Sequence, residues 1–223
     1  MKLYMHPAST TCRPVMMFIA DHGIAVEQQV VDIMSGGQFK PDFAAINPNC
    51  AVPVLEDGDF RMTESSAILK YLADKVGSPT YPKELKARAR VNEVMDWFNT
   101  GFYRCFGYGL CYGQVLDAYK LADAAGQSQA LAAAKAGAAR FLGILDQHIL
   151  GPRPYLCGDQ LTVADYLASG MISLGEVIGC RFDAYPNVER WYGRMKERPN
   201  WQATNAAVYG WAEYARGPAY LTV

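Results

Sequence analysis

The spacing of hydrophobic positions changes once along this chain, near residue 82. Before that point, short apolar alternations predict four strands, at residues 2–6, 27–31, 54–56 and 60–62. Helical spacing predicts three helices between and after them, at residues 13–22, 42–46 and 64–75. The segment Asp57-Gly58-Asp59 predicts a turn that joins the last two strands as a hairpin. The predicted order is therefore βαβαββα.

The second part of the chain is predicted to be helical throughout. Apolar positions recur at helical spacing in four runs, at residues 83–106, 127–149, 188–198 and 201–215. A further helix is predicted to begin near Thr162, because Thr162 and Asp165 fit a variant of the capping box. We therefore predict an α/β domain at residues 1–78, a linker at residues 79–87 and an all-helical domain at residues 88–223.

Composition and charge exclude several classes of partner. The 223 residues are 51% hydrophobic and 19% charged, with a formal net charge of −1, so no general field attracts nucleic acid or acidic membranes. The first residues enter the strand pattern without the apolar run of a signal peptide, and no stretch reaches membrane-spanning length, so we expect a cytosolic location. The 6 cysteines form no Cys-x-x-Cys pair and the 3 histidines have no ligand spacing, so we expect free thiols and no metal.

The loop before the first predicted helix, Ser9-Thr10-Thr11, can favour an anion. Backbone N–H groups at a helix start are unpaired and the helix dipole is positive there, which favours a thiolate nearby. A serine hydroxyl can donate a hydrogen bond to a bound thiolate and lower its pKa from about 8.5 toward neutrality. The alternative is that one of these hydroxyls only caps the helix.

Two further segments suit a bound peptide. If the bond between Val52 and Pro53 is cis, the Val52 backbone N–H and C=O point outward and can pair with an extended peptide; the alternative is an ordinary trans proline. Glu64 and Ser65 open the helix after the hairpin, where backbone N–H groups and the Ser65 hydroxyl can hold a carboxylate while Glu64 accepts from an ammonium group. This pair suits the zwitterionic end of an amino acid, and its alternative is a plain helix cap.

These three elements, in this order within a βαβαββα domain followed by helices, resemble the cytosolic glutathione S-transferase family. The resemblance extends from Lys2 to about Tyr214, is strongest between Ile46 and Asp96, and is closest to the theta-like, serine-type branch. It implies a thioredoxin-like N-terminal domain that binds glutathione, an all-helical C-terminal domain that receives a hydrophobic electrophile, and a homodimer.

The resemblance also implies roles for single residues. Ser9 is implied as the residue that activates the glutathione thiol, because Ser9-Thr10-Thr11-Cys12-Arg13 matches the S-x-x-C-R pattern. Val52 is implied to pair with the cysteinyl backbone beside a cis Pro53, and Glu64 and Ser65 to hold the γ-glutamyl end.

Tyr4 is the alternative to Ser9, since other branches use a tyrosine at the end of this strand. It lies eight residues before Cys12 where seven are expected, which favours a packing role. Cys12 itself is expected to pack inward. The glycyl carboxylate has Gln38 and Lys40 as candidates, with solvated loop residues as the alternative, because the chain departs from the family pattern there.

The aromatic residues of the helical half are candidates for the electrophile pocket, or alternatively for plain core: Tyr103, Phe106, Tyr108, Tyr112, Trp211 and Tyr214. Arg13 or Arg104 could stabilise developing negative charge, or form a surface ion pair. The predicted helix at 83–106 is the expected dimer contact, where Asn92 or Asp96 could reach the partner's glutathione.

We therefore expect a glutathione transferase in which the bound thiolate attacks an electrophilic carbon, without a covalent enzyme intermediate. One alternative is a glutathione-dependent dehalogenase, isomerase or peroxidase on the same site. The other is a non-catalytic binding or assembly module, since this fold also serves as a docking domain. The intact Ser9, Val52-Pro53 and Glu64-Ser65 argue against the second alternative.

Overall fold

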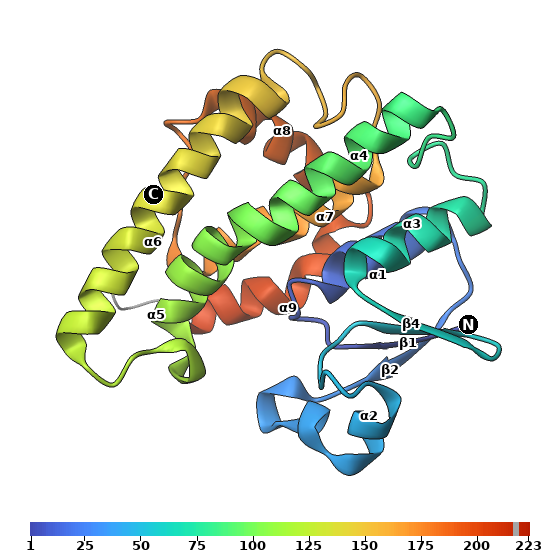
Figure 1. Ribbon diagram of the computed structural model, residues 1–223, viewed down its shortest axis with the longest axis horizontal. Helices are drawn as coiled ribbons and strands as arrows, with labels where there is room; N and C mark the ends of the chain where they lie inside the picture. The colour runs from blue at the N-terminus through green and yellow to red at the C-terminus, as the bar shows by residue number, and fades with distance from the viewer. Residues whose placement is uncertain (216–218) are drawn as a thin grey trace.

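The computed structural model describes residues 1–215 and 219–223, and it shows a small α/β domain beside a larger helical domain (Figure 1). The elements of the first domain are β1 (Lys2–Met5), α1 (Cys12–Asp21), β2 (Glu27–Val30), α2 (Pro41–Ile46), β3 (Val54–Asp57), β4 (Phe60–Thr63) and α3 (Ser65–Lys75). Two short 3₁₀ turns, Ile33–Ser35 and Gly37–Phe39, precede α2. The predicted βαβαββα order is confirmed.

The four strands form one mixed sheet in the order β2-β1-β3-β4. β1 pairs in parallel with β2 and antiparallel with β3, where Leu3 lies opposite Leu55, and β3 pairs antiparallel with β4. Alternation along β1 places Leu3 and Met5 in the main core with α1 and α3, while Tyr4 packs on the other face against Phe43 of α2. The sheet therefore has helices on both faces (Figure 1).

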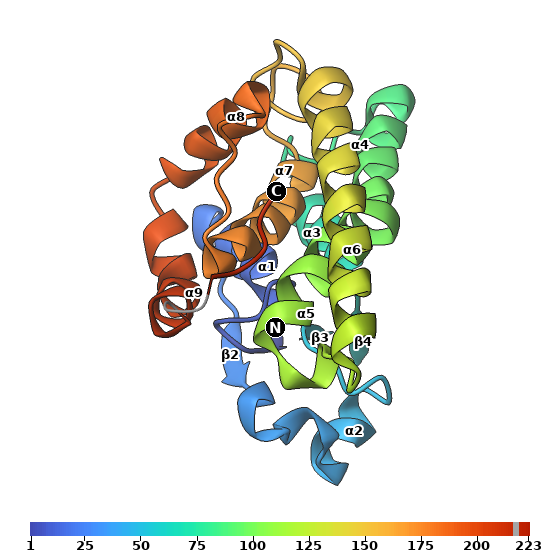
Figure 2. The same cartoon turned by 90° about the vertical axis from the view of Figure 1, so that its left-hand side faces the viewer.

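The described residues of the second domain form helices and the loops between them. Its elements are α4 (Leu85–Trp97), α5 (Gly113–Val115), α6 (Ala124–Ile144), α7 (Val163–Ile172), α8 (Pro186–Lys196) and α9 (Trp201–Tyr214). Every residue of α7 is buried, so this helix forms the centre of the domain, while α4 and α6 lie on its outside (Figures 1 and 2). Among the described residues, no helix is both long enough and apolar enough to cross a membrane.

Helical structure extends beyond residue 106, where the sequence analysis ended the first long helix. π-helical segments at Phe98–Phe102 and Arg104–Tyr112 continue α4 into α5, and another at Leu145–Leu150 continues α6. The glycines that weaken the helical pattern in this region are needed for packing: a Cβ on Gly109 would lie 2.8 Å from the Cβ of Ala134 in α6. Close contact with α6 therefore outweighs the low helix propensity of glycine.

The predicted capping box at the start of α7 is confirmed. Asp165 is fully buried and accepts four hydrogen bonds, from Thr162 N (2.8 Å), Thr162 Oγ1 (2.9 Å), Leu156 N (2.9 Å) and Trp191 Nε1 (2.9 Å). One carboxylate thereby joins the start of α7, the preceding loop and α8.

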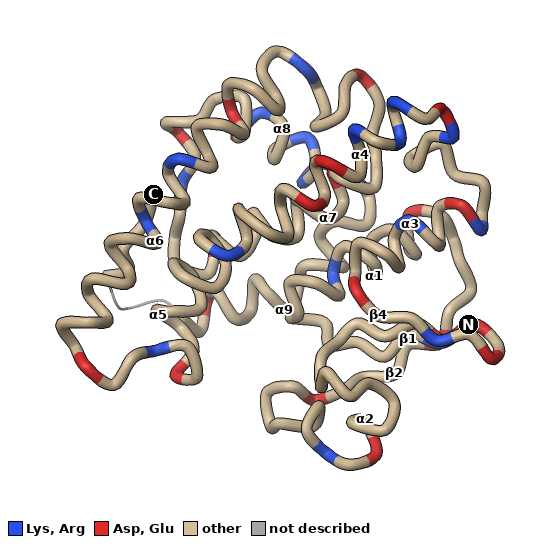
Figure 3. Tube along the Cα trace, in the orientation of Figure 1, with Lys and Arg blue, Asp and Glu red and all other residues tan. Residues whose placement is uncertain are grey.

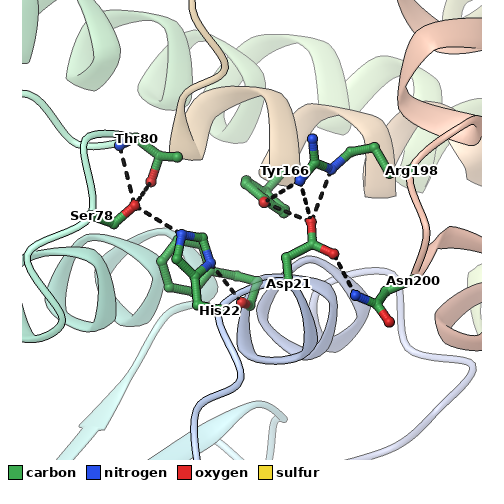
Figure 4. Close-up of polar contacts among 8 residues, drawn as sticks. Asp21, His22, Ser78, Thr80, Tyr166, Arg198 and Asn200 are labelled. Atoms are coloured by element: carbon green, nitrogen blue, oxygen red, sulfur yellow. Dashed lines mark hydrogen bonds and ion pairs between the residues drawn. The ribbon is translucent and has the colours of Figure 1, made fainter.

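Polar contacts connect the two domains at the end of α1 (Figure 4). Asp21 accepts hydrogen bonds from Arg198 (2.6 and 2.9 Å), from the Tyr166 hydroxyl (2.7 Å) and from Asn200 (2.8 Å). Beside it, His22 Nε2 lies 2.9 Å from the Ser78 hydroxyl. Charged residues of both signs are interspersed along the described part of the trace (Figure 3).

Candidate functional site

A cleft of about 510 Å³ lies where the two domains meet. The first domain contributes the loop after β1, the turns at 33–39 and the segment before β3, while the second contributes residues 103–119 and one residue of α9. A second cavity of about 500 Å³, between α4 and the end of α6, contains none of the three sequence motifs. The first cleft is therefore the candidate site.

Ser9 lines this cleft at the start of α1. Its backbone is fixed by the His6 carbonyl, which accepts from Ser9 N (3.0 Å), and by the Ser9 carbonyl, which accepts from Arg13 N (3.1 Å). The Ser9 hydroxyl oxygen accepts from Cys12 N (3.3 Å). The helix-cap alternative and a role toward a ligand are therefore compatible, because the cap uses a lone pair and leaves the hydroxyl proton available.

The position of that proton follows from the neighbouring hydroxyl. Thr11 Oγ1 donates to the Val52 carbonyl (3.1 Å), which uses the only hydroxyl proton of Thr11. In the hydrogen bond between the Ser9 and Thr11 hydroxyls (3.2 Å), Ser9 is therefore the donor. An anion in the cleft would compete with a neutral acceptor for this proton, and hydrogen bonds to charged acceptors are the stronger kind.

The bond between Val52 and Pro53 is cis, as the resemblance implied. Val52 lines the cleft, and Pro53 is buried behind it. The expectation that the Val52 carbonyl is free needs correction, since this oxygen accepts from Thr11 at 3.1 Å. A peptide that pairs with Val52 would therefore share or replace the Thr11 contact.

Glu64 and Ser65 lie at the N-terminus of α3, beside the lining residues of the cleft rather than among them. Glu64 has φ +67° and ψ 112°, a conformation that a non-glycine residue rarely adopts and that costs on the order of 1–3 kcal/mol. Ser65 is buried at the first turn. Burial raises the pKa of the Tyr108 hydroxyl, and the negative charge of Glu64 acts in the same direction.

The two candidates for the glycyl carboxylate differ in position. Gln38 lines the cleft, and its buried Oε1 has no hydrogen-bond partner among the described residues. Lys40 is exposed at the start of α2 and lies outside the lining.

Tyrosines form the opposite wall. The cleft is lined by Tyr103, Tyr108, Tyr112, Tyr119 and Trp211. The ring of Tyr108 meets those of Tyr103 and Tyr112 edge to face, with centroids 4.8 and 5.7 Å apart. Thr11, from the loop that the sequence singled out, also lines the cleft. Tyr119 and Met34 line it too and are not predicted from the sequence, because the turns that carry them show no periodic pattern.

Phe106 is a correction to the sequence analysis. It is fully buried, stacks on Phe102 with centroids 4.9 Å apart, and does not line the cleft. The segment is π-helical, so its hydrogen bonds span five residues and its turns are wider than those of an α-helix. Tyr103, Tyr108 and Tyr112 consequently share one face, and Phe106 lies on another. Tyr214, also expected in the pocket, is 89% exposed.

Three hydroxyls connect this wall to the loop that carries Ser9. Thr10 Oγ1 lies 2.7 Å from the Tyr112 hydroxyl, which lies 3.0 Å from the Tyr103 hydroxyl. Burial raises the pKa of both tyrosines, so they are protonated at neutral pH. The three groups carry three protons for two hydrogen bonds, so one proton remains for a further acceptor.

The remaining candidates lie outside the cleft. The Tyr4 hydroxyl donates to Glu56 (3.0 Å), in agreement with a packing role. Cys12 is fully buried, as expected, and burial raises its pKa to about 11. Arg13 is also buried and forms no surface ion pair, which corrects that alternative, while Arg104 is exposed and does not line the cleft. No group of three His, Cys, Asp or Glu side chains suited to a metal occurs in residues 1–215 and 219–223.

Two family models match successive parts of the chain. A family model described as the glutathione S-transferase N-terminal domain matches residues 3–80, and one described as the glutathione S-transferase C-terminal domain matches residues 113–199. Human glutathione S-transferase theta-2 is 34% identical over 199 residues, which cover 88% of this chain and 80% of that protein. Human glutathione S-transferase theta-1 is 33% identical, with 88% and 82% covered.

Solved structures agree with these relationships. The structure of human glutathione transferase theta-2 in complex with glutathione and an unknown ligand superposes with a TM-score of 0.85 at 29% identity, covering 100% of this chain and 93% of that one. A delta-class glutathione transferase from Nilaparvata lugens gives a TM-score of 0.80 at 30% identity, with 96% and 98% covered.

Proposed function

Since the chain belongs to the glutathione S-transferase family and is a glutathione transferase, we propose that its chemistry takes place in the cleft between the domains, with Ser9 as the residue that holds the glutathione sulfur as a thiolate. Glutathione lies extended along Val52. Its γ-glutamyl end binds at Glu64 and Ser65, and its glycyl carboxylate is held near Gln38.

The observation that carries this proposal is the hydrogen bonding of Ser9. Its oxygen is held by the Cys12 N–H at 3.3 Å, and within residues 1–215 and 219–223 the acceptor for its proton is the neutral Thr11 hydroxyl. A thiolate is a stronger acceptor, and the positive end of α1 adds to its stabilisation. The thiol proton leaves to solvent on binding, and Ser9 keeps its own proton throughout.

The tyrosine wall receives the electrophile. The thiolate sulfur attacks an electrophilic carbon, a C–S bond forms, and the leaving group departs with its electron pair, or the electrons move onto the acceptor when nothing leaves. We assign Tyr103, Tyr108, Tyr112 and Trp211 to this pocket because they line the cleft opposite Ser9. An apolar or aromatic electrophile matches these rings.

Substitution of Ser9 tests the proposal. Loss of a hydrogen bond to a charged group costs about 1.5–3 kcal/mol, so Ser9→Ala is expected to raise the pKa of the bound thiol by roughly 1–2 units. The measurement is the ultraviolet absorbance of the thiolate against pH, with glutathione at saturation, together with the pH profile of kcat/KM. Ser9→Thr is expected to restore much of the shift.

Ser128→Ala is the matched control, because it makes the same chemical change on an exposed turn of α6. An unchanged pKa of the bound thiol in Ser9→Ala would remove Ser9 from the mechanism.

A homodimer and a cytosolic location are further parts of the proposal, and they are supported by the family relationship. Asp96 is exposed on α4, whereas Asn92 already accepts a hydrogen bond from the Tyr81 hydroxyl (3.1 Å) of its own chain. Asp96 is therefore the better placed of the two to reach a partner. Sedimentation equilibrium of the purified chain measures the oligomeric state, and a monomer at all concentrations would contradict the dimer.

A further inference from the structure

Arg13 places a full positive charge inside the protein without a negative partner. The side chain is 1% exposed, and its guanidinium donates to the Ser173 hydroxyl (2.6 Å), the Asn205 side-chain carbonyl and the Gly170 backbone carbonyl (3.2 Å). All three acceptors are neutral, and Nε has no partner at all among the described residues. Within the described part of the chain no carboxylate lies within 4.0 Å of this guanidinium.

Such an arrangement is costly. An arginine cannot escape burial by losing its proton, and an isolated buried charge is destabilising unless it is compensated. Arg198 shows the usual solution in this same molecule, because its guanidinium pairs with the Asp21 carboxylate at 2.6 Å. An uncompensated charge at Arg13 is therefore unlike the rest of the structure and needs a reason.

Arg13 is one helical turn after Ser9, and its backbone N–H donates to the Ser9 carbonyl. Burial raises the pKa of the Cys12 thiol and of the Tyr112 hydroxyl, and in both cases the positive charge of Arg13 acts in the opposite direction. Tyr112 in turn contacts Thr10, the residue next to Ser9, at 2.7 Å.

The groups around the guanidinium leave its charge unscreened. The titratable groups that face it are Tyr103, Tyr112, Tyr192 and Tyr209, from three different segments of the helical domain. Tyrosines with raised pKa values are neutral at physiological pH. Glu176 contacts Tyr192 (2.8 Å), but it is already paired with Lys196 (2.7 Å).

We propose that the uncompensated positive charge of Arg13 stabilises the glutathione thiolate beside Ser9 from behind the active-site loop. The inference rests on the proposed function of Ser9. Arg13 contacts neither the sulfur nor the electrophile, so it is a positioning residue: it fixes a buried charge under the start of α1, where the charge adds to the helix dipole. A negative charge placed against Arg13 should therefore weaken the thiolate.

Asn205→Asp makes this change with almost no change of volume. The new carboxylate pairs with Arg13 and cancels its charge at the loop, at the expense of the bond from Asn205 Nδ2 to the Trp201 carbonyl (2.9 Å). Ser173→Asp brings a carboxylate to the same guanidinium from a different segment. Ser173→Ala is the matched control, since it removes the same hydrogen bond and leaves the charge uncompensated.

The readout is the pKa of bound glutathione, from thiolate absorbance against pH in the full-length protein, with circular dichroism and Tm as checks of folding. Either aspartate variant that folds is expected to have roughly 3- to 10-fold less thiolate at a pH below the parent's pKa. Its kcat/KM should fall by the same factor there and rejoin the parent at high pH, where the thiol is fully ionised. Ser173→Ala is expected to keep the parent's pKa.

A purely structural arginine gives a different result. If the folded aspartate variants bind glutathione with the parent's thiol pKa, or if Ser173→Ala shifts it equally, the inference about Arg13 is overturned while Ser9 keeps its role. If the parent itself forms no thiolate on addition of glutathione, the proposed function fails first. Should both aspartate variants unfold, Arg13→Gln decides because it removes the charge: a thiol pKa above the parent's supports the inference, and the parent's pKa contradicts it.

Discussion

Removal of the Asp165 carboxylate should destabilise the protein far more than removal of an ordinary helix cap. Asp165 is fully buried at the start of α7, and Asp165→Ala leaves four donors without their acceptor, on Thr162 (N and Oγ1), Leu156 and Trp191. Each buried donor left unsatisfied costs about 1–3 kcal/mol. Water that enters the space of the lost carboxylate recovers part of this cost, so we take the lower end and expect a loss of about 4 kcal/mol.

Two further variants provide comparisons for the stability loss expected of Asp165→Ala. Asp165→Asn keeps one oxygen and the side-chain volume, so it is expected to lose about half as much. Asp123→Ala is the matched control, because Asp123 caps α6 with a single bond to Gly126 N (2.6 Å) at an exposed position. An exposed cap is worth about 1 kcal/mol. The order of destabilisation should therefore be Asp165→Ala, then Asp165→Asn, then Asp123→Ala.

Urea unfolding followed by far-ultraviolet circular dichroism measures these differences, at one fixed protein concentration because association shifts apparent stability. A domain typically has 5–15 kcal/mol of stability in total, so the midpoint for Asp165→Ala should fall by a large fraction. If Asp165→Ala cost no more than Asp123→Ala, the four bonds would not act as a buried network and the reasoning would be refuted.

Three further changes test other parts of the structure. Gln38→Ala should weaken glutathione binding several-fold, as measured by calorimetry, while Lys40→Ala should change the affinity little. Equal effects of the two variants would contradict the assignment of the glycyl contact. Tyr112→Phe breaks the link to Thr10 and should raise KM for the electrophile with the thiol pKa unchanged; an altered thiol pKa alone would contradict this. Burial opposes ionisation of Asp21, but hydrogen bonds from its three partners outweigh this and lower its pKa. Its contribution to stability is therefore complete above the unfolded pKa of about 3.9 and lost as pH falls through the lower folded value. Asp21→Asn should be less stable than the parent at neutral pH, and the difference in their free energies of unfolding should disappear in acid. A gap independent of pH would contradict the role of the charge.

Local patterns were sufficient to predict most of the fold. Strand alternation at Leu3 and Met5, the hairpin turn at Gly58 and the capping box at Thr162 each depend on neighbours within a few residues, and the structure confirms all of them. The family resemblance added the cis bond before Pro53, which base rates alone would not have favoured.

The predictions from the sequence were wrong where contacts between residues far apart in the chain determine the structure. The helix continues past residue 106 because Gly109 allows α6 to approach, and nothing near Gly109 in the sequence records that contact. The same π-helical geometry turns Phe106 into the core while Tyr112 faces the cleft. The sequence does not predict the burial of Arg13, because its acceptors, such as Asn205, lie nearly two hundred residues away in the chain.

The contact between Thr10 and Tyr112 has a consequence for how such enzymes diversify. One hydrogen bond connects the tyrosine wall of the electrophile pocket to the loop that carries Ser9. If either domain is replaced by that of a related enzyme, this contact between the domains changes as well. A hybrid of this N-terminal domain and another enzyme's helical domain would leave the Thr10 hydroxyl without its partner, unless the other domain also carries a hydroxyl at the position of Tyr112. A hybrid of two such enzymes therefore has to rebuild this domain contact even where the chemistry of the sulfur is unaffected.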